Sequence, residues 1–296
     1  MVPDIGDFMS SLALLLAVGA AVSWALSQVL TKEGLRRMDF VAYGVVRPLF
    51  ALPFIVAYGL ITSGLHFPDL GLVGIAACGG VIDSFLGTLL YMFSLRRSPA
   101  HLAAPLSSTA PFWGVVTAVL FLGERPHPVV FVAAVLVVLG AYFLGSHRSG
   151  EITGRPVVGT VAALGAGVVW GVAETLPAKY CLAQGMTPIT YQLIMVGAAA
   201  ASWGLLAVWR RRRLPWSPKG LMIAFQSAFA GFFLGWLLWL SGLSLAPASV
   251  LAPVRGSTIL FSFMFSILLL HERPSLRAVV GLLFVSAGVF LVSIMA

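Results

Sequence analysis

The sequence predicts an all-α integral membrane protein whose ten transmembrane helices form two inverted five-helix repeats. Three observations predict this fold class: an apolar composition, ten apolar segments long enough to span a bilayer, and residue patterns that recur 148 positions apart. The expected units are residues 1–148 and residues 149–296.

The composition excludes a soluble globular domain. Of the 296 residues, 59% are hydrophobic and 9% are charged, whereas a soluble domain has about 45–50% apolar and 25% charged residues. The mean hydropathy is +1.00, and the 31 Gly and 17 Pro residues are typical of membrane helices. The net charge of +8 resides mainly in short loops, so we expect a lipid bilayer and no nucleic acid as a partner.

Ten apolar segments are candidates for membrane spans. A hydrocarbon core of about 30 Å takes about 20 helical residues, and charged residues, Pro or Gly separate the apolar runs at suitable intervals. The predicted helices cover residues 10–30, 40–62, 70–94, 100–122, 128–145, 157–180, 188–209, 220–243, 248–270 and 275–295. These helices leave no room for a separate soluble domain.

The two halves of the chain match at positions 148 residues apart. The matched segments contain Gly, Pro, aromatic or charged residues: 86–91 with 234–239, 99–100 with 247–248, 104–105 with 252–253, and 124–126 with 272–274. At slightly shorter offsets, Trp24 matches Trp170 and Lys32 matches Lys179. Because each unit has an odd number of spans, we expect the second unit to enter the membrane from the opposite side.

These features resemble the drug/metabolite transporter superfamily, specifically its ten-helix EamA-type members. The segment from Ser98 to Pro126 ends in Leu-Gly-Glu-Arg-Pro, and the segment from Ala246 to Pro274 ends in Leu-His-Glu-Arg-Pro. Both resemble the family's small-residue helix that closes with Gly-Glu-Arg, and Arg47 resembles the family's arginine in the second helix. The resemblance implies a carrier for small metabolites, often amino acids or drugs, with a central cavity between the halves.

Lys and Arg are concentrated in one set of loops. The loops after odd-numbered helices hold 14 of them, whereas the other loops and the termini hold Arg125 and Lys179. The 14 are Lys32, Arg36, Arg37, Arg96, Arg97, Arg148, Arg155, Arg210, Arg211, Arg212, Arg213, Lys219, Arg273 and Arg277. Since positively charged loops stay in the cytoplasm, we predict a multi-pass protein of the cell (inner) membrane with both termini outside. Family members are described with both termini inside, so the charges predict the opposite orientation.

Two acidic residues lie inside predicted spans, where a charge costs about 2.5–3.5 kcal/mol and indicates a functional site. Asp83 is midway through residues 70–94, and its repeat counterpart is Gly231. It is either a cation or proton site or one partner of a buried salt bridge to Arg47 or Arg255. Glu174 matches Gln28 and either binds a substrate ammonium or a proton from the cavity or pairs with Lys179.

Two arginines also lie inside predicted spans. Arg255 follows Pro253 and occupies the position of Ser107 in the first repeat. It either holds a substrate carboxylate in a bidentate fork or bridges two helices. Arg47 precedes Pro48, and we expect it to have a structural partner rather than a ligand.

Aromatic residues at repeat-related positions are candidates for the walls of a central cavity. Trp24, Trp170, Tyr91 and Trp239 could stack on an aromatic or cationic solute, or they could serve as interfacial anchors and packing residues. Gln192 and His101 are weaker candidates, because both lie near predicted helix starts where interfacial water would hydrate them. The paired Glu124-Arg125 and Glu272-Arg273 at helix ends favour structural contacts.

A secondary transporter of a small zwitterion, with an amino acid as the working choice, is the inferred function. No GxxxxGK[ST] motif occurs, so a gradient or an exchanged solute must drive transport, and proton coupling through Asp83 or Glu174 is one interpretation. Cationic drugs or another metabolite class are alternative substrates. An integral-membrane enzyme is disfavoured by the lack of HExxH and GxSxG, so we expect no catalytic residue, cofactor or metal. One chain contains both halves of the pathway, so a monomer suffices.

Overall fold

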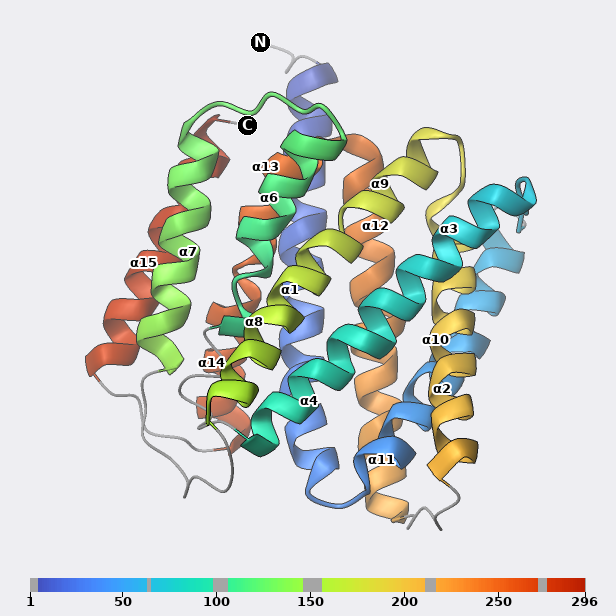
Figure 1. Cartoon of the computed structure of the whole chain (residues 1–296). Helices are drawn as coiled ribbons and strands as arrows, with labels where there is room; N and C mark the ends of the chain where they lie inside the picture. Colours follow the sequence, from blue (N-terminus) through green and yellow to red (C-terminus); the bar gives the residue numbers. More distant parts are fainter. Residues whose placement is uncertain are drawn as a thin grey trace.

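The computed structural model describes residues 5–62, 65–97, 106–145, 156–210, 217–270 and 276–295. Within these ranges all regular secondary structure is helical (Figure 1). The α-helices are α1 (Ile5–Leu35), α2 (Phe40–Thr62), α3 (Leu70–Gly80), α4 (Thr88–Arg97), α6 (Ala110–Phe121), α7 (Val129–Gly145), α8 (Pro156–Ala173), α9 (Leu176–Ala183), α10 (Pro188–Arg210), α11 (Pro218–Ser227), α12 (Trp236–Leu245), α13 (Ala248–Arg255), α14 (Thr258–Leu270) and α15 (Leu276–Met295). Two π-helical segments are η1 (Val81–Gly87) and η2 (Ala228–Gly235).

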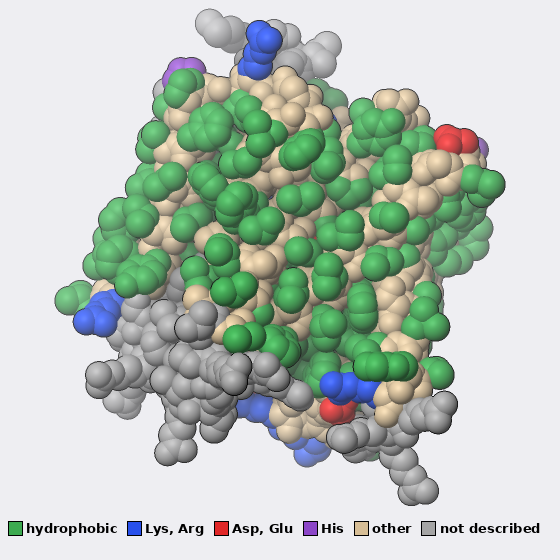
Figure 2. All heavy atoms as spheres, viewed as in Figure 1, with side chains coloured by type: hydrophobic (Ala, Val, Ile, Leu, Met, Phe, Trp, Pro, Cys, Tyr) green, Lys and Arg blue, Asp and Glu red, His purple; other side chains and the backbone are tan. Residues whose placement is uncertain are grey.

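The protein is a multi-pass membrane protein. Seven described helical stretches are long and apolar enough to cross a bilayer: Met9–Leu35, Phe40–Thr62, Leu70–Ser94, Val158–Ala183, Pro188–Arg210, Pro218–Leu245 and Ala248–Leu269. Three further apolar helices are shorter, Ala110–Phe121, Val129–Phe143 and Val279–Leu291. Hydrophobic side chains cover the middle of the face in Figure 2, and the charged ones lie at its two ends. This distribution is the one that a lipid-facing surface requires.

Helix bounds repeat along the chain with the spacing seen in the sequence. α2 and α10 each contain 23 residues, and each bound of α10 lies 148 positions after that of α2. The continuous run α3–η1–α4 covers residues 70–97, and α11–η2–α12 covers residues 218–245, again 148 positions later. In Figure 1, α1 descends from the end that carries the N-terminus, whereas α8 and α9 ascend toward that end.

The helices of the two halves interlock. α1 packs along α11, η2 and α12, and α8 packs against η1 and α4. α10 likewise contacts α3 and η1, whereas α2 contacts η2 and α11. The first two helices of each half therefore pack on the third helical run of the other half, which places residues of both halves at one centre.

The sequence predicted uninterrupted helices over residues 70–94, 157–180, 220–243 and 248–270, and the structure interrupts each of them. η1 and η2 replace one part of the first and third runs, and non-helical backbone separates α8 from α9 and α13 from α14. π-helical turns and broken helices inside a membrane occur where side chains or packed neighbours satisfy the freed backbone groups. Each interruption lies beside a residue of the candidate site.

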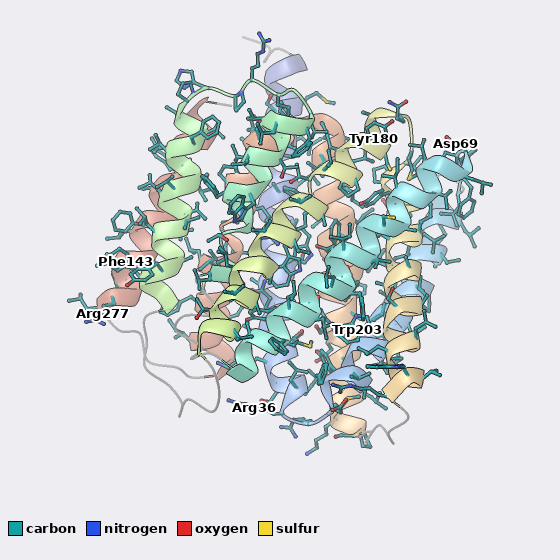
Figure 3. The ribbon with its side chains drawn as sticks, viewed as in Figure 1. Arg36, Asp69, Phe143, Tyr180, Trp203 and Arg277 are labelled. Carbon is teal, nitrogen blue, oxygen red and sulfur yellow. The ribbon has the colours of Figure 1, made fainter. Side chains whose placement is uncertain are left out.

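The two ends of the molecule differ in charge. Arg36 and Arg277 lie at one end and Asp69 at the other (Figure 3). At the first of these ends Glu33 binds Arg37, with 2.6 Å between Oε1 and Nη2, and also binds Arg36. Both of these ion pairs are exposed enough to contribute little stability.

Candidate functional site

Glu174 and Arg255 both lie where a membrane helix breaks. α8 ends at Ala173 and α9 begins at Leu176, so Glu174 occupies the gap. Pro177 accounts for this break, because its ring conflicts with the carbonyl four residues earlier, that of Ala173, and it has no amide to donate. Arg255 is the last residue of α13, and α14 begins three positions later.

The two residues form an ion pair across the break. Nη2 of Arg255 donates to Oε1 of Glu174, and their side chains are 14% and 7% exposed. The guanidinium also lies over the ring of Trp24, with 5.2 Å from Cζ to the ring centroid. A buried charge requires a partner, and here Glu174 and Arg255 neutralise each other. Arg255 therefore bridges two helices, which was one of its two interpretations.

The alternative pairing of Glu174 with Lys179 is wrong. Nζ of Lys179 donates to the carbonyl oxygens of Leu243 at 2.6 Å and Ala246 at 2.8 Å. These carbonyls lie at the C-terminal end of α12, where a positive charge complements the helix dipole. Lys179 is therefore a structural cap of α12. The charge of Glu174 is balanced by Arg255 instead.

Asp83 is buried in η1 and incompletely satisfied. Its side chain accepts a hydrogen bond from Oγ of Ser84 at 2.7 Å through Oδ2, while Oδ1 is enclosed and has no hydrogen-bond partner. No ion pair joins Asp83 to Arg47 or Arg255 among the described side chains, so the salt-bridge interpretation is wrong. Asp83 nevertheless lies within electrostatic range of Arg255 and Glu174, although its hydrogen-bond partner is Ser84. We call these two carboxyl groups and one guanidinium the charged cluster.

Two tryptophans bind the π-helical segments at equivalent positions. Nε1 of Trp24 donates to the carbonyl of Gly231 at 3.2 Å, and Nε1 of Trp170 donates to the carbonyl of Asp83 at 3.3 Å. Residues 83 and 231 are repeat counterparts, as are the two tryptophans. Each indole crosses from one half of the chain to the other and satisfies a backbone carbonyl in the membrane interior.

Gln192 and Trp203 of α10 complete the support of the π-helical segments. Nε2 of Gln192 donates to the carbonyls of Phe232 and Phe233, both at 2.7 Å, and Nε1 of Trp203 donates to the carbonyl of Ser84 at 3.1 Å. Gln192 is fully buried, so the expectation of ordinary interfacial hydration is wrong. Sequence analysis missed Trp203, because nothing in its local pattern distinguishes it from a packing residue.

An aromatic cluster surrounds the ion pair. The ring of Trp24 lies 5.6 Å from that of Trp236 and 5.8 Å from that of Trp239, between centroids. Nε1 of Trp239 donates to the carbonyl of Glu174 at 3.0 Å. Tyr91 packs on Trp170 at 5.4 Å, so the four predicted aromatic residues form two contacting pairs. Trp236 was not predicted, because its repeat counterpart is Thr88 and no symmetry singles it out.

Arg47 and Gln28 lie apart from the ion pair. Nη2 of Arg47 donates to Oγ of Ser27 at 3.0 Å, which is the structural partner that the sequence led us to expect. Gln28 is exposed and accepts a hydrogen bond from Ser262 at 3.1 Å. Its environment therefore differs from that of its counterpart Glu174. His101 lies outside the described residues.

Glu124 stabilises the start of α13. Its carboxylate accepts hydrogen bonds from the backbone amides of Ala248 at 2.9 Å and Ser249 at 2.8 Å. A carboxylate at a helix N-terminus satisfies unpaired amides and complements the dipole. The prediction of a helix-end contact is confirmed for this Glu-Arg-Pro segment, whereas the side chains of residues 272–274 lie outside the described residues.

Comparison with known proteins relates both halves of the chain to one group. The profile of the family described as "EamA-like transporter family" matches residues 11–146 and, a second time, residues 157–294. Two uncharacterized transporters of Archaeoglobus fulgidus are 23% and 24% identical to this chain. The alignments cover 95% and 96% of this chain and 97% and 98% of those proteins.

Two further similarities cover different lengths. A riboflavin transporter of Rhizobium johnstonii is 29% identical over 128 residues, which are 43% of this chain and 39% of that protein. The crystal structure of another protein superposes with a TM-score of 0.80 over 97% of this chain and 98% of that chain, at 18% identity. This superposition shows that the two chains share a fold.

Proposed function

The chain belongs to the EamA-like transporter family, and from that membership we propose that it is a secondary transporter of a small zwitterionic metabolite, most simply an amino acid. The observation that carries the proposal is the cluster of Asp83, Glu174 and Arg255, which three separate helical runs bring together from both halves of the chain. Buried charges at interrupted membrane helices are typical of solute and ion sites in transporters.

We propose ten transmembrane helices in two inverted repeats. Seven long spans and three shorter apolar helices support the count, and the recurrence of helix bounds at an offset of 148 supports two units that meet near residue 148. The opposite directions of α1 and of α8 with α9 (Figure 1) support inversion. Alternating access would then be a movement of one repeat against the other around the central cluster.

The solute would lie between charged and aromatic groups. An ammonium is the natural partner for the unsatisfied Oδ1 of Asp83. The indoles of Trp24, Trp236 and Trp239 are buried against one another, so an aromatic or aliphatic side chain of the solute would bind there once the indoles move apart. The two carboxyl groups of the cluster outnumber its single guanidinium, so a proton or a cationic group would balance the charge. Asp83 is therefore our candidate for proton coupling.

A second candidate substrate is a planar aromatic heterocycle. The tryptophan cluster offers flat apolar rings, and one relative that matches part of the chain is described as a riboflavin transporter.

We also propose that the end with Arg36 and Arg277 faces the cytoplasm, because Lys and Arg accumulate there. Both termini would then lie outside the cytoplasm.

Uptake into proteoliposomes tests the function. The labelled solutes are amino acids, riboflavin, a cationic drug, a nucleoside and a sugar phosphate, each with and without a pH gradient. Saturable uptake of an amino acid is expected. Uptake of another solute without any amino acid would overturn the substrate class, flux that does not saturate would indicate a channel, and chemical conversion of the solute would indicate an enzyme.

Asp83→Asn tests the coupling role. The substitution should abolish uptake driven by the pH gradient, because the amide keeps the shape and cannot exchange the proton. Counterflow exchange should persist with a raised KM, because the amide oxygen still accepts from the ammonium of the solute but no longer carries a charge. Glu33→Gln is the matched control, since Glu33 lies at the charged end of the molecule and pairs only with Arg36 and Arg37 among the described residues. Unchanged gradient-driven uptake in Asp83→Asn would exclude the coupling role.

A further inference from the structure

Arg47 is a cation inside a membrane helix that no carboxylate balances among the described residues. It lies in α2, and the described ion pairs involve Arg36, Arg37 and Arg255 instead. A lone guanidinium in a span costs several kcal/mol, so its retention requires compensation. The contacts of the guanidinium within the protein compensate part of this cost.

Among the described residues, the guanidinium has one hydrogen-bond partner and two aromatic neighbours. Nη2 donates to Oγ of Ser27 at 3.0 Å, and Cζ lies 4.8 Å from the ring centroid of Phe232 and 5.5 Å from that of Tyr43. Nε is enclosed and has no hydrogen-bond partner. A guanidinium carries five N–H donors, so most of its donor capacity is unused although the residue as a whole is only partly buried.

The hydroxyl groups next to the arginine carry no negative charge. Oγ of Ser27 lies 2.9 Å from Oγ of Ser227, and Oγ1 of Thr31 lies 3.0 Å from the same Ser227 oxygen. The hydroxyls of Ser27 and Thr31 already donate to the carbonyls of Ser227 at 2.8 Å and Ser27 at 2.7 Å. The donors left for a carboxylate are therefore the remaining N–H groups of the guanidinium.

Arg255 is the less suitable arginine for the same task. Its charge is neutralised by Glu174, and a substrate carboxylate could reach it only by displacing that partner or by leaving Glu174 buried without a counter-ion. Arg47 requires no such displacement, because its charge has no partner to lose.

The position of Arg47 also relates it to Asp83. A Cβ placed on Gly231 would lie 3.5 Å from Nη2 of Arg47, and Gly231 is the repeat counterpart of Asp83. The carbonyls of residues 231 and 83 accept from the equivalent indoles of Trp24 and Trp170. Thus the two equivalent junctions between a tryptophan and a π-helical segment carry opposite charges, one from Arg47 and one from Asp83.

We propose that Arg47 binds the carboxylate of the transported solute through its remaining N–H groups, whereas Arg255 serves as the counter-ion of Glu174. The inference rests on the proposed transport of a zwitterion and names the residue that recognises its negative end. It differs from the expectation that Arg47 has only a structural partner, because Ser27 satisfies one of its five N–H groups.

The test compares an amino acid with its amide. L-Phenylalanine and L-phenylalaninamide are matched in size, and only the first has a carboxylate. Both carry the ammonium when the assay is run about two pH units below the pKa of an α-amino group. In proteoliposomes with the wild-type protein, the KM for the amide should exceed that for the acid at least tenfold, as expected when a bidentate pair is lost. Arg47→Met should raise the KM for L-phenylalanine at least tenfold and change the KM for the amide less than twofold.

Two further variants separate binding from structure. Arg47→Lys keeps the charge and loses the fork, so it should fold like the wild type and raise only the KM for L-phenylalanine, about threefold to tenfold. The double variant Glu174→Gln/Arg255→Gln removes the ion pair without leaving a buried charge. Because both residues belong to the proposed solute site, the transport rate should fall, but the KM for the amide should still exceed that for the acid at least tenfold.

Each outcome decides between distinct conclusions. Equal losses for acid and amide in both Arg47 variants would make Arg47 a structural residue, and loss of the preference in the double variant alone would assign the carboxylate to Arg255. Either result overturns the inference and leaves the carrier intact. If the wild-type protein carries other solutes and rejects L-phenylalanine and every other amino acid, the zwitterion class fails and Arg47 loses its assigned ligand. A KM that rises for L-phenylalanine and not for its amide in the Arg47 variants would support both the zwitterion class and the assignment of the carboxylate to Arg47.

Discussion

The first helical run of each half has matching residues and a different shape. α1 extends without interruption over 31 residues, whereas the equivalent run in the second half breaks between α8 and α9. The interrupted run contains Pro177, and α1 contains no proline. A repeat therefore specifies where a helix lies, while one proline decides whether the helix can expose backbone and a buried carboxylate at its centre.

The same comparison distinguishes the side chains at equivalent positions. Gln28 is exposed on the continuous helix, and Glu174 is buried at the break. Trp24 and Trp170 keep equivalent hydrogen bonds, but only Trp24 lies under a guanidinium. The residues that we propose for function thus lie where the halves differ, and the shared residues hold the halves together.

Glu174→Gln gives the broken run the residue of the continuous one. It leaves Arg255 buried without its counter-ion, so we expect a loss of about 3–5 kcal/mol in the free energy of unfolding. Equilibrium unfolding in mixed detergent–SDS micelles measures this loss. Adding Arg255→Gln should recover much of it, and a single variant as stable as the wild type would show that the ion pair is dispensable.

Lys179→Met removes the cap that α9 provides for α12. Two charge-assisted hydrogen bonds to backbone carbonyls disappear, and the expected loss is about 2 kcal/mol because the ammonium is only partly buried. The same unfolding assay applies. Lys179→Arg should retain most of the stability, whereas equal losses in both variants would point to a packing role for the side chain.

Trp24→Phe removes one of the two equivalent indole donors. The carbonyl of Gly231 loses a partner in the membrane interior, which should cost about 1 kcal/mol. Trp170→Phe is the matched variant and should cost a similar amount through the carbonyl of Asp83. A large difference between the two losses would mean that the stacked guanidinium of Arg255, present only at Trp24, dominates over the shared hydrogen bond.

Gln28→Ala is expected to have the smallest effect. The residue is exposed and accepts a hydrogen bond from Ser262, so the free energy of unfolding should change by less than about 0.5 kcal/mol. Transport of L-phenylalanine by this variant should also match the wild type. A loss comparable to that of Glu174→Gln would show that the two positions are functionally equivalent after all.

The membrane class and the placement of the helices could be predicted from the amino-acid sequence. Apolar runs and their charged or proline boundaries are local features, so the predicted range 40–62 coincides with α2 (Phe40–Thr62). The end contact of Glu124 was also predictable, because a matched Glu-Arg-Pro at two helix ends indicates a structural role. Bilayer thickness and backbone satisfaction act on each segment separately, and so a single sequence reveals them.

The pairing of the polar groups depends on how the helices pack in three dimensions. Glu174 pairs with a residue 81 positions away rather than with the nearby Lys179, and Trp24 bonds to a carbonyl 207 positions away. The prediction of interfacial hydration for Gln192 was wrong because its acceptors belong to a π-helical segment, η2, that no local sequence pattern predicts. Because an unpaired charge or carbonyl in the membrane interior costs free energy, each of them requires a partner. The identity of that partner follows from how the two halves interlock.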